Sequence, residues 1–242
     1  WALLLLLTAC GRLGFDSRSD ASTDGTTPLD VMLVADAQQP WTGPVPIAGG
    51  WTNLPGNAAT ISTPPLQFAA GDFIVVAVGW RSAQATISSI TSSTGITYTQ
   101  RTPIEGPGTV TQVMYTSVAS MNAPETVFVD FGGAVPSPSI RILSYRNATM
   151  SVPTGSGATG NGALATTGVV TTNRADVMLV AALSAASPAT GPGVGFTIQC
   201  LTNPSGDVFQ DMRAPSPASY QGTAPLTASA GYIGHMLMLE PP

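Results

Sequence analysis

Apolar residues after Trp51 come in short runs, some alternating with polar residues and some continuous, and turn residues interrupt them about every ten positions. This pattern is typical of an all-β protein. Runs that are apolar throughout, such as 73–78, predict strands buried on both faces. The predicted strands are 73–80, 86–91, 96–101, 109–118, 126–131, 139–146, 165–171, 177–183, 195–201, 207–212 and 226–240.

The strand pattern repeats once along the chain. Three segments have later counterparts in the same order: 71–78 with 175–182, 96–100 with 195–199, and 140–145 with 234–239. We therefore predict one β-sandwich domain over 51–242, built from quasi-repeated halves at about 51–150 and 160–242. Either two small sandwiches lie in tandem or the halves interleave into one jelly-roll-like sandwich. The Gly-rich join without charges favours interleaving.

Residues 155–160 match the pattern G-x-G-x-x-G of dinucleotide-binding loops. Such a loop must be followed at once by a helix, whose N-terminus binds the phosphates. The next segment, 163–172, is instead rich in Thr and Val, and no acidic residue lies about twenty positions on to meet a ribose. We predict a flexible loop between the two halves.

The start of the chain has the pattern of a targeting segment. Residues 2–9 are apolar but too short to cross about 30 Å of hydrocarbon. They lead into Leu7-Thr8-Ala9-Cys10, which resembles the lipobox of bacterial lipoproteins. The resemblance implies a thioether-linked diacylglyceryl group on Cys10, cleavage just before it, and anchoring to a membrane by the acyl chains.

The lipobox resemblance also predicts the roles of the segments on either side of Cys10. Residues 1–9 are expected to be a signal peptide truncated at its start, because Trp1 is preceded by no Met or basic residues. Residues 10–50 are rich in Gly, Ser, Thr, Pro and Asp, which predicts a disordered, lipid-anchored linker. The family resemblance implies an envelope location, in the outer membrane because Gly11 rather than Asp follows the cysteine, facing the periplasm or the cell surface.

The amino-acid composition limits the ligands and the cysteine chemistry that are expected of the chain. Charged residues are 9% of the chain and the net charge is -5, which argues against binding to nucleic acid. Cys200 lies in an apolar run and is expected to be a buried structural thiol.

The single histidine, His235, is expected on the rim of the last strand or facing solvent. Ser144, Ser184 and Asp130 are conceivable triad partners, but the chain lacks the G-x-S-x-G elbow. Carboxylates form no obvious catalytic pair, and Asp72 and Asp176 are expected to form turn hydrogen bonds. We predict a protein that is not an enzyme.

Ligand-binding candidates are few. Calcium stays open as a cofactor because sandwich loops often bind it, although no Asp-x-Asp-x-Asp run is present, and no other cofactor is expected. Trp41 and Trp51 lie beside Pro or Gly and are the expected exposed contacts for a glycan or protein ligand. The expected function is a lipid-anchored binding or adhesion module. The alternatives are a structural envelope lipoprotein and an exported hydrolase.

Overall fold

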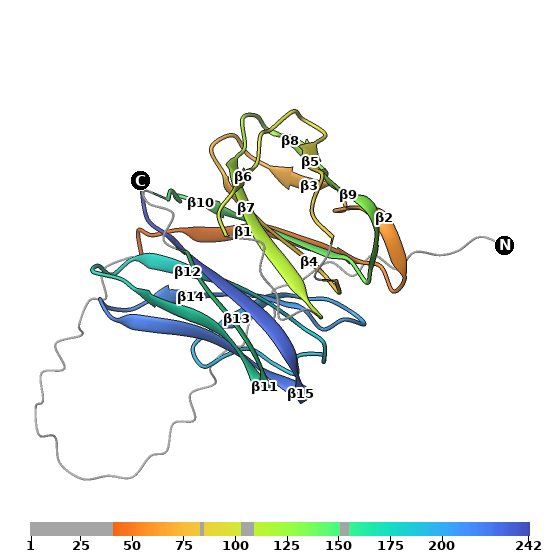
Figure 1. Cartoon of the computed structure of the whole chain (residues 1–242). Helices are drawn as coiled ribbons and strands as arrows, with labels where there is room; N and C mark the ends of the chain where they lie inside the picture. Colours follow the sequence, from red (N-terminus) through yellow and green to blue (C-terminus); the bar gives the residue numbers. More distant parts are fainter. Residues whose placement is uncertain (1–40, 83–84, 103–108, 151–154) are drawn as a thin grey trace, which may run out of the picture. The chain divides into compact units, whose positions relative to one another are not determined.

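The computed structural model describes residues 41–82, 85–102, 109–150 and 155–242. The predicted signal peptide, the lipobox with Cys10 and the linker up to residue 40 lie outside these residues. The residues from Thr42 to Pro242 belong to one compact unit. Strands make up the regular structure of its described residues, which confirms the predicted all-β sandwich (Figure 1).

No helix in the described part of the chain is long and apolar enough to cross a membrane.

The first half contains three antiparallel sheets. Its strands are β1 (Val45–Asn53), β2 (Asn57–Ser62), β3 (Leu66–Phe68), β4 (Phe73–Trp80), β5 (Ser89–Ser92), β6 (Thr99–Gln100), β7 (Thr111–Val118), β8 (Ala123–Glu125), β9 (Val127–Pro136) and β10 (Ser139–Arg146). A five-stranded sheet has the order β1-β10-β4-β7-β6. A three-stranded sheet, β2-β9-β5, is called the outer sheet below, and β3 pairs with β8.

The second half forms one five-stranded sheet with the order β11-β15-β12-β14-β13. Its strands are β11 (Gly155–Thr171), β12 (Val177–Ala185), β13 (Thr197–Leu201), β14 (Val208–Ala214) and β15 (Ser219–Leu239). Chain order and sheet order therefore match strand by strand between the two five-stranded sheets, which confirms the two quasi-repeated halves. Among the described residues neither half contributes a strand to a sheet of the other, so the favoured interleaving of strands is wrong.

The Gly-rich segment at the start of the second half is a strand, not the flexible loop predicted from its sequence. Residues 155–160 belong to β11 and pair with residues 232–237 of β15. Two register shifts, after Gly162 and after Thr166, interrupt the β11–β15 ladder, and the paired strands fold back there over their own sheet. A Cβ on Gly234 would lie 2.4 Å from the carbonyl oxygen of Thr166, so this fold-back requires glycine.

Each half has its own hydrophobic core. Alternate residues of β4 point into the first core: Ile74, Val76, Val78 and Trp80. Alternate residues of β12 point into the second: Leu179, Ala181, Leu183 and Ala185. The residue of β12 that is structurally equivalent to a given residue of β4 thus lies one position later than the sequence repeat indicates. A one-residue shift in a strand moves every side chain to the opposite face of the sheet.

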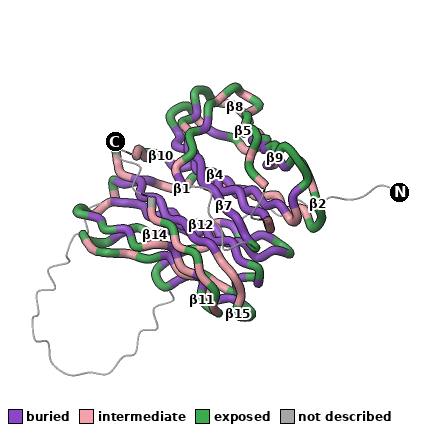
Figure 2. The backbone as a smooth tube through the Cα atoms, in the orientation of Figure 1, coloured by how far each residue is buried: buried purple, intermediate pink, exposed green. Residues whose placement is uncertain are grey.

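The opposite faces of β4 and β12 are also covered, since every residue of both strands is buried. Figure 2 shows this burial as continuous purple over the central strands. Hydrogen bonds from Arg141 of β10 to backbone oxygens of Leu183 and Val208 join the two five-stranded sheets through these faces. Burial on both faces explains why the central strands have no polar alternation in their sequence.

Several segments differ from the sequence prediction at their boundaries. Strand β1 begins at Val45, inside the stretch 10–50 that was predicted to be a linker. Strands β1, β2, β3 and β8 were not predicted, because these segments lack a long apolar run. The first half therefore contains four more strands than the sequence predicted.

Candidate functional site

The described residues form two polar regions that are candidate sites: a buried cluster between the five-stranded sheets and an exposed groove on the outer sheet. The buried cluster is built around Arg141, which is fully buried on β10. Its Nη1 donates to Leu183 O at 3.0 Å and to Val208 O at 2.7 Å. Its Nη2 donates to Gln112 Oε1 at 2.9 Å and to Ser184 Oγ at 2.8 Å. Burial lowers the pKa of Arg141, and the carboxylate of Asp207 acts in the opposite direction.

Gln112 fixes the protonation state of the histidine. Arg141 can only donate, so the Gln112 side-chain oxygen faces it, and the amide nitrogen donates to Ala182 O at 3.0 Å. That nitrogen also lies 3.1 Å from Nδ1 of His235, which must therefore accept and leave the proton on Nε2. Burial, and then the charge of Arg141, lowers the pKa of His235 to about 4.

This environment overturns the expected rim position of His235. The side chain is completely buried, and its Nε2 has no hydrogen-bond partner among the described residues. A neutral imidazole without solvent access cannot exchange protons with a substrate at neutral pH.

The conceivable triad residues are not assembled around the histidine. Ser184 Oγ donates to Gln112, Ser144 Oγ donates to Ala48 O, and Asp130 accepts from the Gly132 amide on the outer sheet. No carboxylate hydrogen-bonds to His235 in the described part of the chain. The structure therefore separates the residues that a nucleophilic mechanism would need together.

The other buried acids have structural partners. Asp207 accepts from Ser139 Oγ at 2.6 Å and from Ser205 Oγ at 3.2 Å. Asp211 accepts from Tyr145, and burial raises the pKa of both groups. Asp72 accepts from the Ala69 amide in a turn, as predicted. Across the described ranges no group of three His, Cys, Asp or Glu side chains could hold a metal ion.

Cys200 is fully buried, as expected for a structural thiol, and its Sγ lies 3.7 Å from the carbonyl oxygen of Gly50. It therefore packs between the halves, away from solvent.

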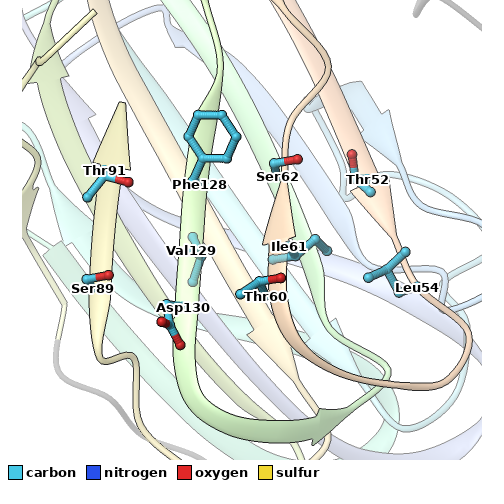
Figure 3. A pocket seen from close by; sticks show the side chains of 10 residues that line it. All are labelled: Thr52, Leu54, Thr60, Ile61, Ser62, Ser89, Thr91, Phe128, Val129 and Asp130. Carbon is cyan, nitrogen blue, oxygen red and sulfur yellow. The ribbon is translucent and has the colours of Figure 1, made fainter. Parts of the chain in front are cut away.

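The exposed groove has a volume of about 370 Å³ and lies on the outer sheet (Figure 3). Its lining residues are Thr52, Leu54, Thr60, Ile61, Ser62, Ser89, Thr91, Phe128, Val129 and Asp130. Ile61 and Val129 point down into the first core. Alternation along each strand therefore turns their neighbours outward, toward solvent.

The outward side chains form two rows across the three strands. In one row, Asp130 of β9 stands between Thr60 of β2 and Ser89 of β5. In the other, Phe128 stands between Ser62 and Thr91, as Figure 3 shows. Phe128 is 46% exposed, a large value for an aromatic side chain in the middle of a sheet.

Most polar groups of these two rows make no hydrogen bond with the described residues. The hydroxyls of Thr60, Ser62, Ser89 and Thr91 make no hydrogen bond with the described residues. Asp130 Oδ1 accepts from the Gly132 amide at 2.7 Å, which orients the carboxylate and leaves Oδ2 for another partner. The two rows thus offer a fixed carboxylate, four hydroxyls and one aromatic face.

The predicted ligand-contact residues do not form this groove. Trp51 is half-buried and lies opposite Arg141 in the β1–β10 ladder, so it faces away from the side of β1 that carries Thr52. Trp41 is not among the residues that line the groove. The alternation Val127-Phe128-Val129-Asp130 was the available signal, because it places an aromatic and an acid on one exposed face.

Comparison of the chain with protein-family models, with curated proteins and with solved structures gave no match, so the arrangement of these residues is the basis on which function is proposed.

Proposed function

We propose that this protein is a non-catalytic binding module, held at the cell envelope by lipid on Cys10, with the outer sheet as its binding surface. The observation that carries the proposal is the exposure of Phe128 beside hydroxyls without partners in the described structure. The groove volume falls within the range of about 300–1,000 Å³ that is usual for ligand sites.

The state of the titratable groups supports a non-catalytic role. General acid–base catalysis needs an accessible group with a pKa near the working pH. His235 is buried with its pKa lowered to about 4, and Asp207 and Asp211 are buried with structural partners. Asp130 is the acid among the described residues that line the groove, and none of these residues places a second carboxylate beside it to complete a hydrolytic pair.

Binding is tested with the full chain on an array of immobilised glycans and purified surface proteins. We expect capture by wild type, at least a tenfold weaker signal from Phe128→Ala, and an unchanged signal from Val118→Ala. Val118 is a matched control because it is 51% exposed at the end of β7 and does not line the groove. Equal capture by all three proteins would refute the assignment of the outer sheet.

Anchoring is tested separately by replacing the lipobox cysteine. Cys10→Ser removes the thiol that forms the thioether, so we expect the protein to move from the membrane fraction to the soluble fraction while its fold is retained. Mass spectrometry of the wild-type N-terminus should find acyl groups on Cys10. An exported protein with an unmodified, uncleaved Cys10 would exclude the lipid anchor.

A structural envelope lipoprotein is the second candidate, favoured by strand β11. This strand forms an edge of its sheet over seventeen residues and contains no charged residue. Natural edge strands usually contain charges or proline that prevent further pairing. If β11 pairs within an envelope assembly, a Thr159→Cys protein should form a disulfide-linked or cross-linked complex in cells, whereas Val118→Cys, at the exposed end of β7, should not.

A further inference from the structure

The outer sheet has the chemistry to bind an uncharged carbohydrate, and this inference rests on the binding function proposed above. We infer that the row of Ser62, Phe128 and Thr91 supports the apolar face of a sugar ring. The neighbouring row, with Asp130 at its centre, then accepts hydrogen bonds from the hydroxyls of the same or the next sugar. Both rows cross the same three strands in register.

Phe128 supplies the stacking surface. A pyranose has one face lined by C–H groups, which carry a slight positive charge, and the face of a phenyl ring is negative. Phe128 is exposed while its chain neighbours Val127 and Val129 are buried, so the ring projects from a rigid strand rather than from a loop. A fixed ring loses little conformational entropy on binding.

The hydroxyls and the carboxylate suit a ligand rich in O–H groups. Serine and threonine hydroxyls both donate and accept, as do sugar hydroxyls, whereas an ionised carboxylate only accepts. Asp130 Oδ2 can therefore accept from two adjacent sugar hydroxyls, in bonds stronger than those between neutral groups. Strands lie about 4.8 Å apart, so each row spans about 10 Å, enough for more than one sugar ring.

The charge of the groove selects against anionic sugars. Asp130 is the charged residue among those that line it, and no Arg or Lys stands beside it in the groove. A uronate, sialate or phosphate group seated over the row would meet the carboxylate at close range without a compensating cation.

A folded protein partner fits these observations less well. A stable protein interface buries about 800 Å² on each side and depends on Trp, Tyr and Arg anchors. The groove is small, and none of these three residue types lines it. An oligosaccharide matches both its size and its side chains.

Calorimetry on the full chain tests the inference with cellohexaose, maltohexaose, mannohexaose and xylohexaose, and with oligogalacturonate as the charged probe. We expect at least one neutral oligosaccharide to bind, and oligogalacturonate to bind at least tenfold more weakly. Phe128→Ala should weaken binding of the neutral sugar at least tenfold and Asp130→Asn about fivefold, with Val118→Ala unchanged. Circular dichroism and thermal unfolding verify that each variant is folded.

The outcomes separate this inference from the proposed function. Failure of every neutral sugar, or equal binding of oligogalacturonate, overturns the carbohydrate assignment. If Phe128→Ala then still abolishes capture of a protein on the array, the binding function stands with a protein ligand instead. If no ligand on the array depends on Phe128, both the inference and the proposed function are wrong.

Discussion

The two halves of the molecule build the same five-stranded sheet in the same order, but they cover its outer face differently. The first half uses the separate outer sheet β2-β9-β5. The second half folds the ends of β11 and β15 back over the sheet, and the single bridge between Ala189 and Leu226 stands where the first half has β5. The groove lies on the outer sheet, at the place where the two copies differ.

The difference between the halves distinguishes the residues that build the fold from those that form the proposed binding surface. Central strands β4 and β12 are buried and apolar in both copies because each packs on two layers. Polar residues between the halves are buried and hydrogen-bonded to one another, whereas the hydroxyls of the two rows on the outer sheet make no hydrogen bond with the described residues.

The largest effect is expected where the halves meet. Arg141→Met leaves Gln112, Ser184 and two backbone oxygens without their buried donor, so the free energy of unfolding should fall by about 3–5 kcal/mol. Urea unfolding measures the change. Arg174→Met is the control, because Arg174 is exposed, and should change stability by less than about 0.5 kcal/mol. Equal effects would mean that the buried guanidinium does not hold the halves together.

Acid should weaken the same interface. The folded chain binds a proton on His235 only near pH 4, whereas the unfolded chain binds it near pH 6.5. Above pH 6.5 His235 is neutral in both states, so it does not destabilise the folded chain. As the pH falls from 6.5 toward 4, the unfolded chain binds the proton first, and the free energy of unfolding falls by up to about 3 kcal/mol. His235→Asn should remove this loss in urea titrations over pH.

Subtracting the variant from wild type isolates His235 from Asp211, whose raised pKa favours the folded state in acid and so acts in the opposite direction. Parallel pH profiles for the two proteins would refute the assigned role of His235.

The fold-back of the second half should be sensitive to a single methyl group. Gly234→Ala brings Cβ against the Thr166 backbone, so we expect a loss of about 1–3 kcal/mol in unfolding free energy. Gly56→Ala, in the first half, has no atom within 4 Å of the new Cβ and should change stability far less. A tolerated Gly234→Ala would show that β11 and β15 have room to separate.

The smallest stability effect is expected on the outer sheet. Phe128→Ala removes an exposed ring and should cost less than about 1 kcal/mol, while Val129→Ala, its buried neighbour on β9, should cost about 2 kcal/mol. Thermal unfolding of the two variants compares the faces of one strand. A larger loss for Phe128→Ala would place the ring in the core and remove the basis for a binding role.

Much of the fold could be predicted from the sequence, because burial leaves a local pattern. The continuous apolar runs identified β4 and β12, and the repeat identified the matching halves. The Gly-rich start of β11 could not be recognised, since Gly160 leaves room for the ring of Tyr232, which lies on the paired strand β15, far away in sequence. The one-residue error in aligning β12 arose because a fully buried strand has no alternation to fix its register.

The candidate site was harder to predict because it exists only through pairing across strands. Thr60, Ser89 and Asp130 are far apart in the chain and form a row only through the registers of β2, β9 and β5. The burial of His235 likewise depends on Gln112 and Arg141 of the other half. Local patterns cannot show which distant strand covers a residue.

Amide chemical-shift mapping by NMR tests the central claim most directly. On titration of the full chain with a neutral oligosaccharide, we predict shifts concentrated at residues 60–62, 89–91 and 128–130, with none at Arg141 or His235. Shifts concentrated in the second half or between the sheets would contradict the assignment of the outer sheet as the binding surface. The absence of shifts with every neutral oligosaccharide would contradict the carbohydrate ligand.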